Sequence, residues 1–458
     1  MQKQIIHERI DCLREVMRGS AVDAVLVFSA DPHLSECPPA HWQTRQWLSG
    51  FTGSAGVLLL TKDFAGLWTD SRYHEQAAQQ LSGTGIMAVP VPAGESHAYA
   101  RWLTENLASG SVLSVSAWEI SAHTGRALKN QMRGSDISLR TDVDLPGQIW
   151  ADRPALPHSA VYAHSMDYAG KSRQEKLAAV REVMCQKEAD WHFISALDDI
   201  AWLLNLRGAD MPFSPLFLSH LLLGKQGAVL FVDADRVPPA VRDALLQDGI
   251  GLQAYDKAAS VLTQLPSGST VLMDAERVSA GMYQSVGDAE QVVESLNPTL
   301  LMKSRKTEKE IAHIRRTALC DGIALCEFFA WFEDAMACGD AITELDVAER
   351  LDDFRREQPG FVSPSFRSIV AFNANAALPH YQATADHNTL IRGNGLLLID
   401  SGGQYLGGTT DITRVVPIGT PSAAQKRDFT LVLKGLIALS SACFPCGIPP
   451  AMLDAIAR

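Results

Sequence analysis

Short apolar segments alternate with amphipathic segments of helical spacing over the first two thirds of the chain. The apolar runs lie at Ala24 to Phe28, Val57 to Leu60, His192 to Ile194 and Ala228 to Val232. Short apolar strands separated by helices are typical of α/β domains. The pattern therefore predicts an α/β fold for this part of the chain.

A long helix is predicted after Ser304. Thr307 and Glu310 have the spacing of a capping box, in which each side chain pairs with the backbone of the other residue. Apolar positions with helical spacing follow, and these are expected to form its buried face: Ile311, Ile314, Ala318, Gly322, Leu325, Phe329 and Phe332. This change of pattern marks the start of a different domain, with α+β character.

Further elements are predicted downstream. A helix is expected near Glu344 to Arg356 and a strand at Ser368 to Phe372. A second capping box, at Ser422 and Gln425, opens a helix. This helix is expected to bury five apolar side chains: Phe429, Val432, Leu433, Leu436 and Ile437. The apolar stretch from Gly435 to Ile448 is likewise interpreted as buried helix.

The first two thirds of the chain contain an internal repeat. Three segments recur in the same order: Leu13–Met17 as Val180–Met184, Phe28–Asp31 as Ile194–Leu197, and Trp47–Gly53 as Trp202–Gly208. Such self-similarity indicates two copies of one α/β module. Prolines at 154 and 157 mark the first boundary, so the predicted domains are 1–153, 154–303 and 304–458.

Two carboxylates lie in the most informative motif of the chain. An apolar strand, Leu396 to Asp400, leads into a Gly-rich turn, after which a Thr/Val-rich strand brings in Asp411. A turn centred on Tyr405 and Leu406 would place the two carboxylates directly opposite each other on one face. That arrangement suits two divalent ions held about 3.5–4 Å apart. A capped turn without metal is the alternative interpretation, since two carboxylates do not complete such a site.

The composition narrows the class of protein. The 458 residues carry a net charge of −12, which argues against nucleic-acid and anionic-membrane partners because both need a basic face. The N-terminus lacks the apolar core of a signal peptide, and no uncharged apolar stretch is long enough for a membrane span. Eight cysteines without framework spacing are expected to be reduced thiols, which predicts a cytoplasmic protein.

Several segments carry a resemblance to a known family: Asp31–Glu36, Trp47–Gly56, Trp68–Tyr73, Asn375–Tyr381 and Ile399–Arg414. Together they resemble the pita-bread metallopeptidases, and in particular the long, three-domain form of Xaa-Pro aminopeptidase (aminopeptidase P). The resemblance implies two creatinase-like α/β domains followed by an incomplete pita-bread domain.

The resemblance also implies an activity and a site. The expected enzyme is a dinuclear-metal aminopeptidase that hydrolyses the bond between an N-terminal residue and a following proline. Asp400 is then a ligand of one ion and Asp411 bridges both, while His380 contacts the substrate and Arg72 reaches the site from the first domain. Two divalent ions are implied, manganese first, with zinc or cobalt as alternatives. The expected partners are peptides with proline in second position; a homodimer is left open.

The family pattern needs one later His ligand and two Glu ligands, which would lie beyond Arg458. We therefore interpret the chain as truncated at its C-terminus and expect it to be inactive as given. Residues after about Ser304 are expected to be its least stable part. Two alternatives remain: a prolidase- or creatinase-like hydrolase of the same fold, and a non-catalytic pita-bread binding module.

Overall fold

The computed structural model describes residues 2–92, 94–95, 97–287 and 291–458. The chain divides into two compact units, Met1–Thr317 with Gln404–Gly408, and Ala318–Gly403 with Thr409–Arg458. The first α/β module contains α1 (Gln2–Gly19), β1 (Ala24–Val27), η1 (Ala40–Trp42), α2 (Thr44–Ser49), β2 (Val57–Thr61), β3 (Ala65–Thr69), α3 (His74–Leu81), β4 (Met87–Pro90), α4 (Ala98–Asn106), β5 (Val112–Val115), α5 (Ala122–Gln131), β6 (Ser138–Arg140) and α6 (Leu145–Ile149). The second module contains β7 (Tyr162–Ala163), α7 (Met166–Ala169), α8 (Arg173–Gln186), β8 (Trp191–Ile194), α9 (Leu197–Leu204), β9 (Leu206–Arg207), β10 (His220–Gly224), β11 (Ala228–Phe231), η2 (Ala234–Arg236), α10 (Pro239–Gln247), β12 (Ile250–Gln253), η3 (Tyr255–Lys257), α11 (Ala258–Leu262), β13 (Thr270–Met273), α12 (Ala280–Gln284), β14 (Gln291–Glu294) and α13 (Pro298–Ser304).

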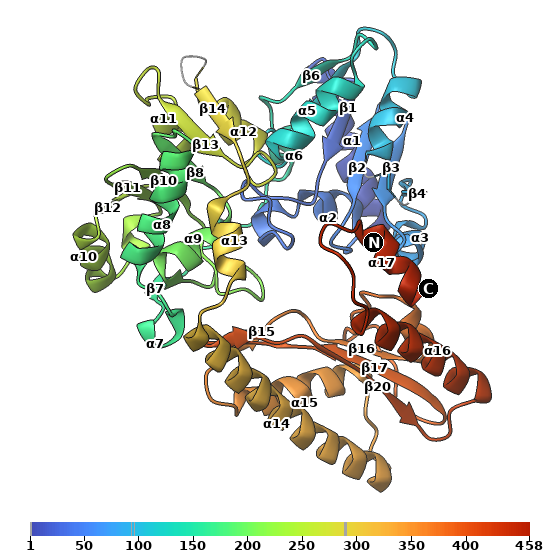
Figure 1. The fold of residues 1–458 in the computed structure, drawn as a ribbon. Helices are drawn as coiled ribbons and strands as arrows, with labels where there is room; N and C mark the ends of the chain where they lie inside the picture. The colour runs from blue at the N-terminus through green and yellow to red at the C-terminus, as the bar shows by residue number, and fades with distance from the viewer. Residues whose placement is uncertain (1, 93, 96, 288–290) are drawn as a thin grey trace. The chain divides into compact units, whose positions relative to one another are not determined.

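Each module is built on a six-stranded sheet, and the two sheets have the same topology (Figure 1). The strand orders are β4-β3-β2-β1-β5-β6 and β12-β11-β10-β8-β13-β14. In both sheets three consecutive strands pair antiparallel, β3-β2-β1 and β11-β10-β8, and the outer pairings are parallel. The helices cover both faces of these sheets, as expected for an α/β module. The predicted internal repeat is therefore confirmed at the level of topology.

One repeated contact ties helix α1 of the first module, and helix α8 of the second, to a tryptophan. The guanidinium of Arg9 lies 4.3 Å from the ring centre of Trp47 and donates to its carbonyl oxygen at 2.7 Å. In the second module the Lys176 ammonium lies 4.4 Å from the ring centre of Trp202 and donates to its carbonyl oxygen at 2.8 Å. Both are cation–π contacts combined with a hydrogen bond. The sequence match between the two tryptophans thus corresponds to one structural role, as a packing residue.

A second repeated contact joins the two central parallel strands of each sheet. The carboxylate of Asp23 accepts a hydrogen bond from Val112 N at 2.8 Å, where β5 begins. The carboxylate of Asp190 accepts one from Thr270 N at 2.9 Å, where β13 begins. In each case one aspartate satisfies a strand-end amide that the sheet leaves unpaired.

The second unit is organised around a three-stranded antiparallel sheet of order β16-β17-β20. Its elements are α14 (Glu308–Cys338, whose first turns belong to the first unit), α15 (Glu344–Arg356), β15 (Phe361–Pro364), β16 (Ile369–Phe372), η4 (Asn373–Ala377), β17 (Gly395–Ser401), β20 (Ile412–Ile418), α16 (Ala423–Ser440) and α17 (Pro450–Ala457). The short strands β18 (Gly403–Tyr405) and β19 (Gly408–Thr409) lie where the chain passes into the first unit and returns. Helices α14 and α15 cover one face of the sheet (Figure 1) and share a hydrophobic core with it. The helix predicted at 344–356 is confirmed, as are both predicted capping boxes.

The predicted buried face of α14 is only partly correct. Leu325 and Phe332 are buried as expected, whereas Ile314 is 39% exposed and Ala318 is also exposed. The helix instead turns Asp321 inward, where it forms a fully buried ion pair with Arg355 of α15, with Nε and Oδ1 2.7 Å apart. A buried charge needs a paired partner, so this ion pair fixes which face of α14 is covered.

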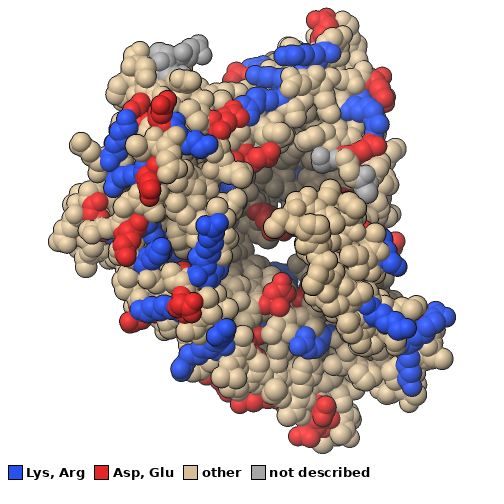
Figure 2. All heavy atoms as spheres, in the orientation of Figure 1, with Lys and Arg blue, Asp and Glu red and all other residues tan. Residues whose placement is uncertain are grey.

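The helix α16 differs from its prediction. Its capping box forms, but the apolar side chains that follow are exposed, not buried, and Val432 reaches 74% exposure. The same holds for α17, and Figure 2 shows a mostly uncharged surface over it. An amphipathic helix gains little stability without a surface to bury its apolar face. Within the described residues, no helix is long and apolar enough to cross a bilayer.

Limited proteolysis should therefore cut the chain first within 423–458. Helices with few buried contacts open locally at low free energy, whereas the sheet of the second unit has a core of its own. We expect chymotrypsin to release this segment before it cleaves either six-stranded sheet or the β16-β17-β20 sheet. Mass spectrometry of the early fragments shows the order of cleavage. The expected site of low stability is therefore 423–458, not the whole region after Ser304. Equal protease resistance of the two α/β modules and the C-terminal region, with a single unfolding transition, would contradict this prediction.

Candidate metal centre

The strand β17 directs Asp400 to the face of its sheet opposite the core shared with α14 and α15. Side chains of a strand alternate between faces, and Leu397 and Ile399 are buried in the core shared with α14 and α15. Leu398 and Asp400 therefore point to the other face, where both are half-buried. The apolar alternation of the strand thus determines the direction of the carboxylate.

The two carboxylates lie close together but are not directly opposite. In the β17–β20 ladder Asp400 pairs with Thr413, whereas Asp411 comes two residues before Thr413, just ahead of the first residue of β20. Asp411 still interacts with Asp400 through charge and a hydrogen bond. The predicted proximity is correct and the predicted register is wrong.

The register follows from the position of the turn. The turn residues are Leu406 and Gly407, one position later than expected, because Tyr405 stays in strand β18 with its side chain buried. Closer to the carboxylates, Gly403 N donates to Thr410 Oγ1 at 2.9 Å, and Thr410 N donates back to the Gly403 carbonyl at 2.9 Å. The hairpin is therefore held in one register on both sides of the turn.

A glycine next to Asp400 allows the strands to approach closely. A Cβ atom at Gly402 would lie 2.0 Å from the carbonyl oxygen of Thr410. No side chain fits at that distance, so the residue that follows Ser401 has to be glycine. This explains part of the Gly-rich turn in physical terms.

The electrostatics of the pair favour a bound cation. Burial raises the pKa of Asp411, and the charge of Asp400 together with a hydrogen bond to it raises that pKa further. Asp400 also accepts a hydrogen bond from Thr413 Oγ1 at 2.7 Å. Two carboxylates held together in this way repel each other when both are ionised, and a divalent cation relieves the repulsion. Their oxygen donors suit manganese-like ions, so the residues present fit part of a metal site. Among the described residues, no group of three or more His, Cys, Asp or Glu is placed to hold a metal ion.

The predicted substrate-contacting residue His380 lies in a turn after η4, in the same unit as the carboxylates. The next residue, Tyr381, is buried and packs on Ile369 and Ala371 of β16, with Leu398 of β17 beside them. Ile369 is the direct partner of Asp400 in the sheet. The turn that carries His380 is therefore packed on the face to which Asp400 points.

The predicted first-domain residue Arg72 belongs to the other compact unit. It lies just before α3, where its guanidinium makes two hydrogen bonds of 2.9 Å to the Asp70 carboxylate. The hydrogen bonds from Arg72 lower the pKa of Asp70. The side chain of Arg72 is half-exposed, so a solvated ion pair accounts for its local contacts.

Two residues that contact either Asp400 or the loop of His380 were missed from the sequence. Thr413 belongs to the motif segment, but the expected register did not place it beside Asp400. Glu344, at the start of α15, is fully buried and binds the loop that carries His380. The sequence carries no periodic signal for Glu344, because its partners lie 28 to 45 positions away.

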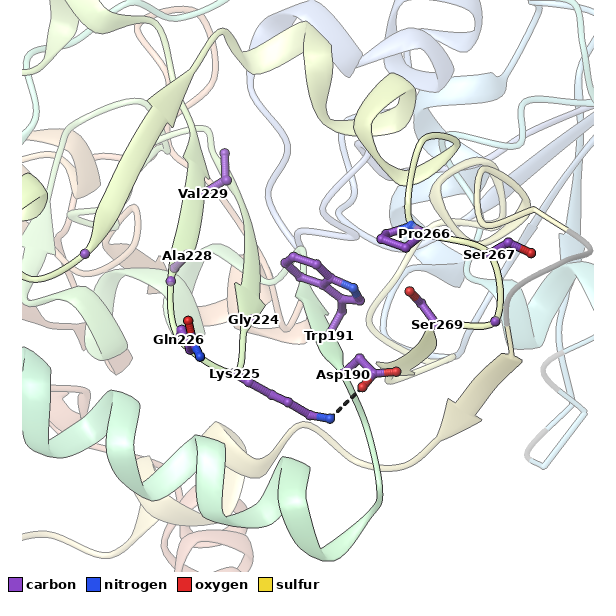
Figure 3. Close-up of a pocket in the computed structure, with 13 residues that line it drawn as sticks. Asp190, Trp191, Gly224, Lys225, Gln226, Ala228, Val229, Pro266, Ser267 and Ser269 are labelled. Atoms are coloured by element: carbon purple, nitrogen blue, oxygen red, sulfur yellow. Dashed lines mark hydrogen bonds and ion pairs between the residues drawn. The ribbon is translucent and has the colours of Figure 1, made fainter.

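A hollow of about 670 Å³ opens in the second α/β module (Figure 3). Its rim is formed by the turn between β10 and β11 and by the chain just before β8 and β13, with Trp191 in its wall. Lys225 and Asp190 form an ion pair of 2.6 Å across one side, drawn as a dashed line in Figure 3. All of its lining residues lie between 190 and 269, and none is a predicted site residue.

Comparison with known proteins gives matches along the whole chain. Family models for the Creatinase/Prolidase N-terminal domain match residues 9–153 and 152–310, and the model for Metallopeptidase family M24 matches residues 312–458. The chain is 36% identical over 467 residues to a probable Xaa-Pro aminopeptidase P of Talaromyces marneffei, covering 98% of this chain and 70% of that protein. It is 34% identical over 490 residues to aminopeptidase P2 of Arabidopsis thaliana, covering 100% of this chain and 69% of that one.

A solved structure is similar over almost all of this chain. It is the X-prolyl aminopeptidase of Caenorhabditis elegans, described as a cytosolic enzyme with a di-nuclear active site. The TM-score is 0.93 at 29% sequence identity, covering 99% of this chain and 76% of that one.

Proposed function

Because this chain belongs to the Xaa-Pro aminopeptidases of metallopeptidase family M24, we propose that its carboxylate pair forms one half of a two-metal peptidase site. The proposed reaction removes an N-terminal residue that precedes proline. The single observation that supports it is that Asp400 and Asp411 lie together within the M24-matched region. Peptides with proline in second position are the proposed substrates.

Each site residue has a proposed role. Asp400 and Asp411 would hold two divalent ions, manganese first, which supply Lewis-acid activation of the scissile carbonyl. Thr413 orients the Asp400 carboxylate through its 2.7 Å hydrogen bond. His380 contacts the substrate near the scissile bond, and Arg72 contributes from the first α/β module.

A dedicated enzyme is chemically reasonable for this substrate. The X–Pro peptide bond is a tertiary amide without an N–H group. A peptidase that grips the scissile amide through that N–H cannot hold it. The turn that carries His380 packs on the face of the sheet to which Asp400 points. Carboxylates and an imidazole there can contact the substrate without the missing N–H donor.

The remaining organisation is also proposed. The proposed domains extend over 1–153, 154–303 and 304–458. The proposed location is the cytoplasm. Whether the protein forms a homodimer is left open. Two carboxylates alone position a metal ion poorly. A polypeptide of residues 1–458 should therefore release no N-terminal residue from an X-Pro peptide, even with added Mn²⁺.

A chimera tests this function directly. The chimera consists of residues 1–458 followed by the part of the Talaromyces relative that comes after its last residue aligned with this chain. We expect it to hydrolyse X-Pro peptides in the presence of Mn²⁺. His380→Ala in the chimera should lower kcat by about 10²–10⁴-fold with metal content unchanged, as for loss of a group acting on the reacting bond. Metal content is measured by plasma emission spectrometry and hydrolysis by release of the first amino acid.

Three outcomes would contradict the proposal or one of its assigned roles. Robust turnover by residues 1–458 alone, abolished by Asp411→Ala, would show that the pair needs no further ligands. A folded, metal-loaded chimera that cleaves only X-Pro dipeptides would favour the prolidase alternative. Loss of metal from the His380→Ala chimera would make that histidine a ligand instead.

A further inference from the structure

A buried carboxylate that no assigned role accounts for lies under the His380 turn. Glu344 has no exposed surface, although it is the first residue of α15 after the Thr343 N-cap. Acidic residues in the first turn of a helix usually remain in solvent, where they interact with the helix dipole. Asp346, in the same turn, does so and bonds only the Thr343 N-cap. Glu344 is therefore buried for a different reason.

The partners of Glu344 come from both ends of one loop, residues 373–389. Its Oε1 accepts from Phe372 N at 2.6 Å, where β16 ends, and its Oε2 accepts from Thr389 N at 2.8 Å. The backbone N of Glu344 in turn donates to the Thr389 carbonyl at 3.1 Å. One side chain thus closes a 17-residue loop that otherwise has no regular strand or α-helix of its own.

Two more partners lie on either side of His380 within that loop. Asn375 Nδ2 donates to both carboxylate oxygens, at 2.9 and 3.1 Å. Tyr381 donates its hydroxyl to Oε2 at 2.8 Å, and burial followed by this bond and the charge of Glu344 raises the pKa of Tyr381. Since Tyr381 directly follows His380, the histidine is one peptide bond from a residue held by Glu344.

Every partner of this carboxylate is a hydrogen-bond donor. A carboxylate offers about four acceptor positions and no donor, which matches the Phe372, Thr389, Asn375 and Tyr381 donors. A glutamine of the same size would turn its NH₂ group towards at least one of these donors. The network therefore selects a carboxylate, not merely a side chain that fills the space.

We propose that Glu344 is the positioning residue that fixes loop 373–389, and with it His380, on the Asp400 face of the sheet. The inference rests on the proposed function for the role of His380, but the fixing of the loop stands on the contacts of Glu344 alone. A purely structural role would make Glu344 a core anchor whose loss weakens the whole unit. A positioning role makes the loss local to the loop.

Hydrogen–deuterium exchange of residues 1–458, read by mass spectrometry, separates these two roles. Glu344→Gln should speed exchange in 373–389 by at least about ten-fold, since each bond to a charged group contributes at least that factor in an opening equilibrium. Peptides from β17 should change less than about two-fold. Val347→Ala is the matched control, because Val347 is fully buried in the same helix and belongs to a hydrophobic core that includes no residue of 373–389. It should speed exchange across the unit, and Asp346→Asn should leave the loop unchanged.

A spectroscopic measurement reports on the histidine itself. The His380 ring signal in a histidine-labelled protein is assigned by its disappearance in His380→Gln. We expect Glu344→Gln and Tyr381→Phe to move or broaden this signal. Val347→Ala should leave it in place, even when it lowers the free energy of unfolding as much as Glu344→Gln does. Uniform exchange across the unit in Glu344→Gln, or an unchanged His380 signal, would overturn the proposal. Neither measurement depends on bound metal or on turnover. The role of Glu344 can therefore be tested even if the chimera shows no peptidase activity.

Discussion

Asp411→Asn is expected to weaken Mn²⁺ binding by the chimera at least about 10–100-fold, the range seen when even outer partners of a metal ligand are lost. The change removes a negative charge from the pair and replaces one oxygen by an NH₂ group, which cannot bind a cation. Asp400→Asn should have a similar effect, because the two carboxylates lie close together and interact. Affinity is measured by electron paramagnetic resonance of free Mn²⁺, and hydrolysis of an X-Pro peptide should fall with it.

The control is Asp353→Asn, which removes an exposed carboxylate from α15 that pairs only with nearby arginines. It removes one negative charge, as Asp411→Asn does, so it reports any loss of Mn²⁺ binding that is due to general electrostatics. Equal weakening by Asp353→Asn and Asp411→Asn would show that Mn²⁺ is bound diffusely. Unchanged affinity in both Asp400→Asn and Asp411→Asn would remove the pair from the site.

Arg355→Ala is expected to cost about 3–5 kcal/mol of the stability of the second unit, because it leaves Asp321 buried without its counter-charge. Both side chains are fully buried, and Arg355 makes two hydrogen bonds to the carboxylate, of 2.7 and 3.3 Å. Asp321→Ala should have a comparable effect. Pulse proteolysis in urea, followed on fragments from β16 to β20, measures the unfolding of this unit.

The double variant Asp321→Leu with Arg355→Met provides the matched comparison. Replacing both charges by apolar groups of similar volume is often neutral or stabilising, since no charge is left uncompensated. We expect it to recover most of the stability lost in either single variant. If the double variant were as unstable as Arg355→Ala, shape at this α14–α15 contact would matter more than charge.

The family, the α/β class and the repeat were predictable because each depends on a pattern that extends over many residues. The predicted family is confirmed, and the strands expected at Val57 and Ala228 begin at those residues. The helix 344–356 was predictable for the same reason, as its apolar spacing and cap agree. Long patterns tolerate local exceptions, so they identify elements and their order reliably.

The predictions that were wrong depend on single side chains. The turn of the hairpin was predicted one residue too early, because the Gly-rich sequence around Tyr405 does not show that Tyr405 is buried in its strand. The face of α14 was misjudged because Asp321 looks like a surface residue until Arg355 is found beside it. Glu344 was missed for a similar reason, since its four donors come from residues up to 45 positions away. Polar residues that are buried by a distant partner leave no periodic signal.

The repeated cation–π contact has a consequence for how the two modules respond to alkaline solution. Burial lowers the pKa of Lys176 to about 8, from an ordinary value of 10.5. Between these values the folded second module binds fewer protons than its unfolded chain, so this lysine adds stability as the pH rises through that range. At the same position the first module has Arg9, whose planar guanidinium makes the corresponding contact with Trp47. Two copies that share one geometry therefore differ chemically at this contact, because the second copy places there a lysine whose pKa is lowered by burial.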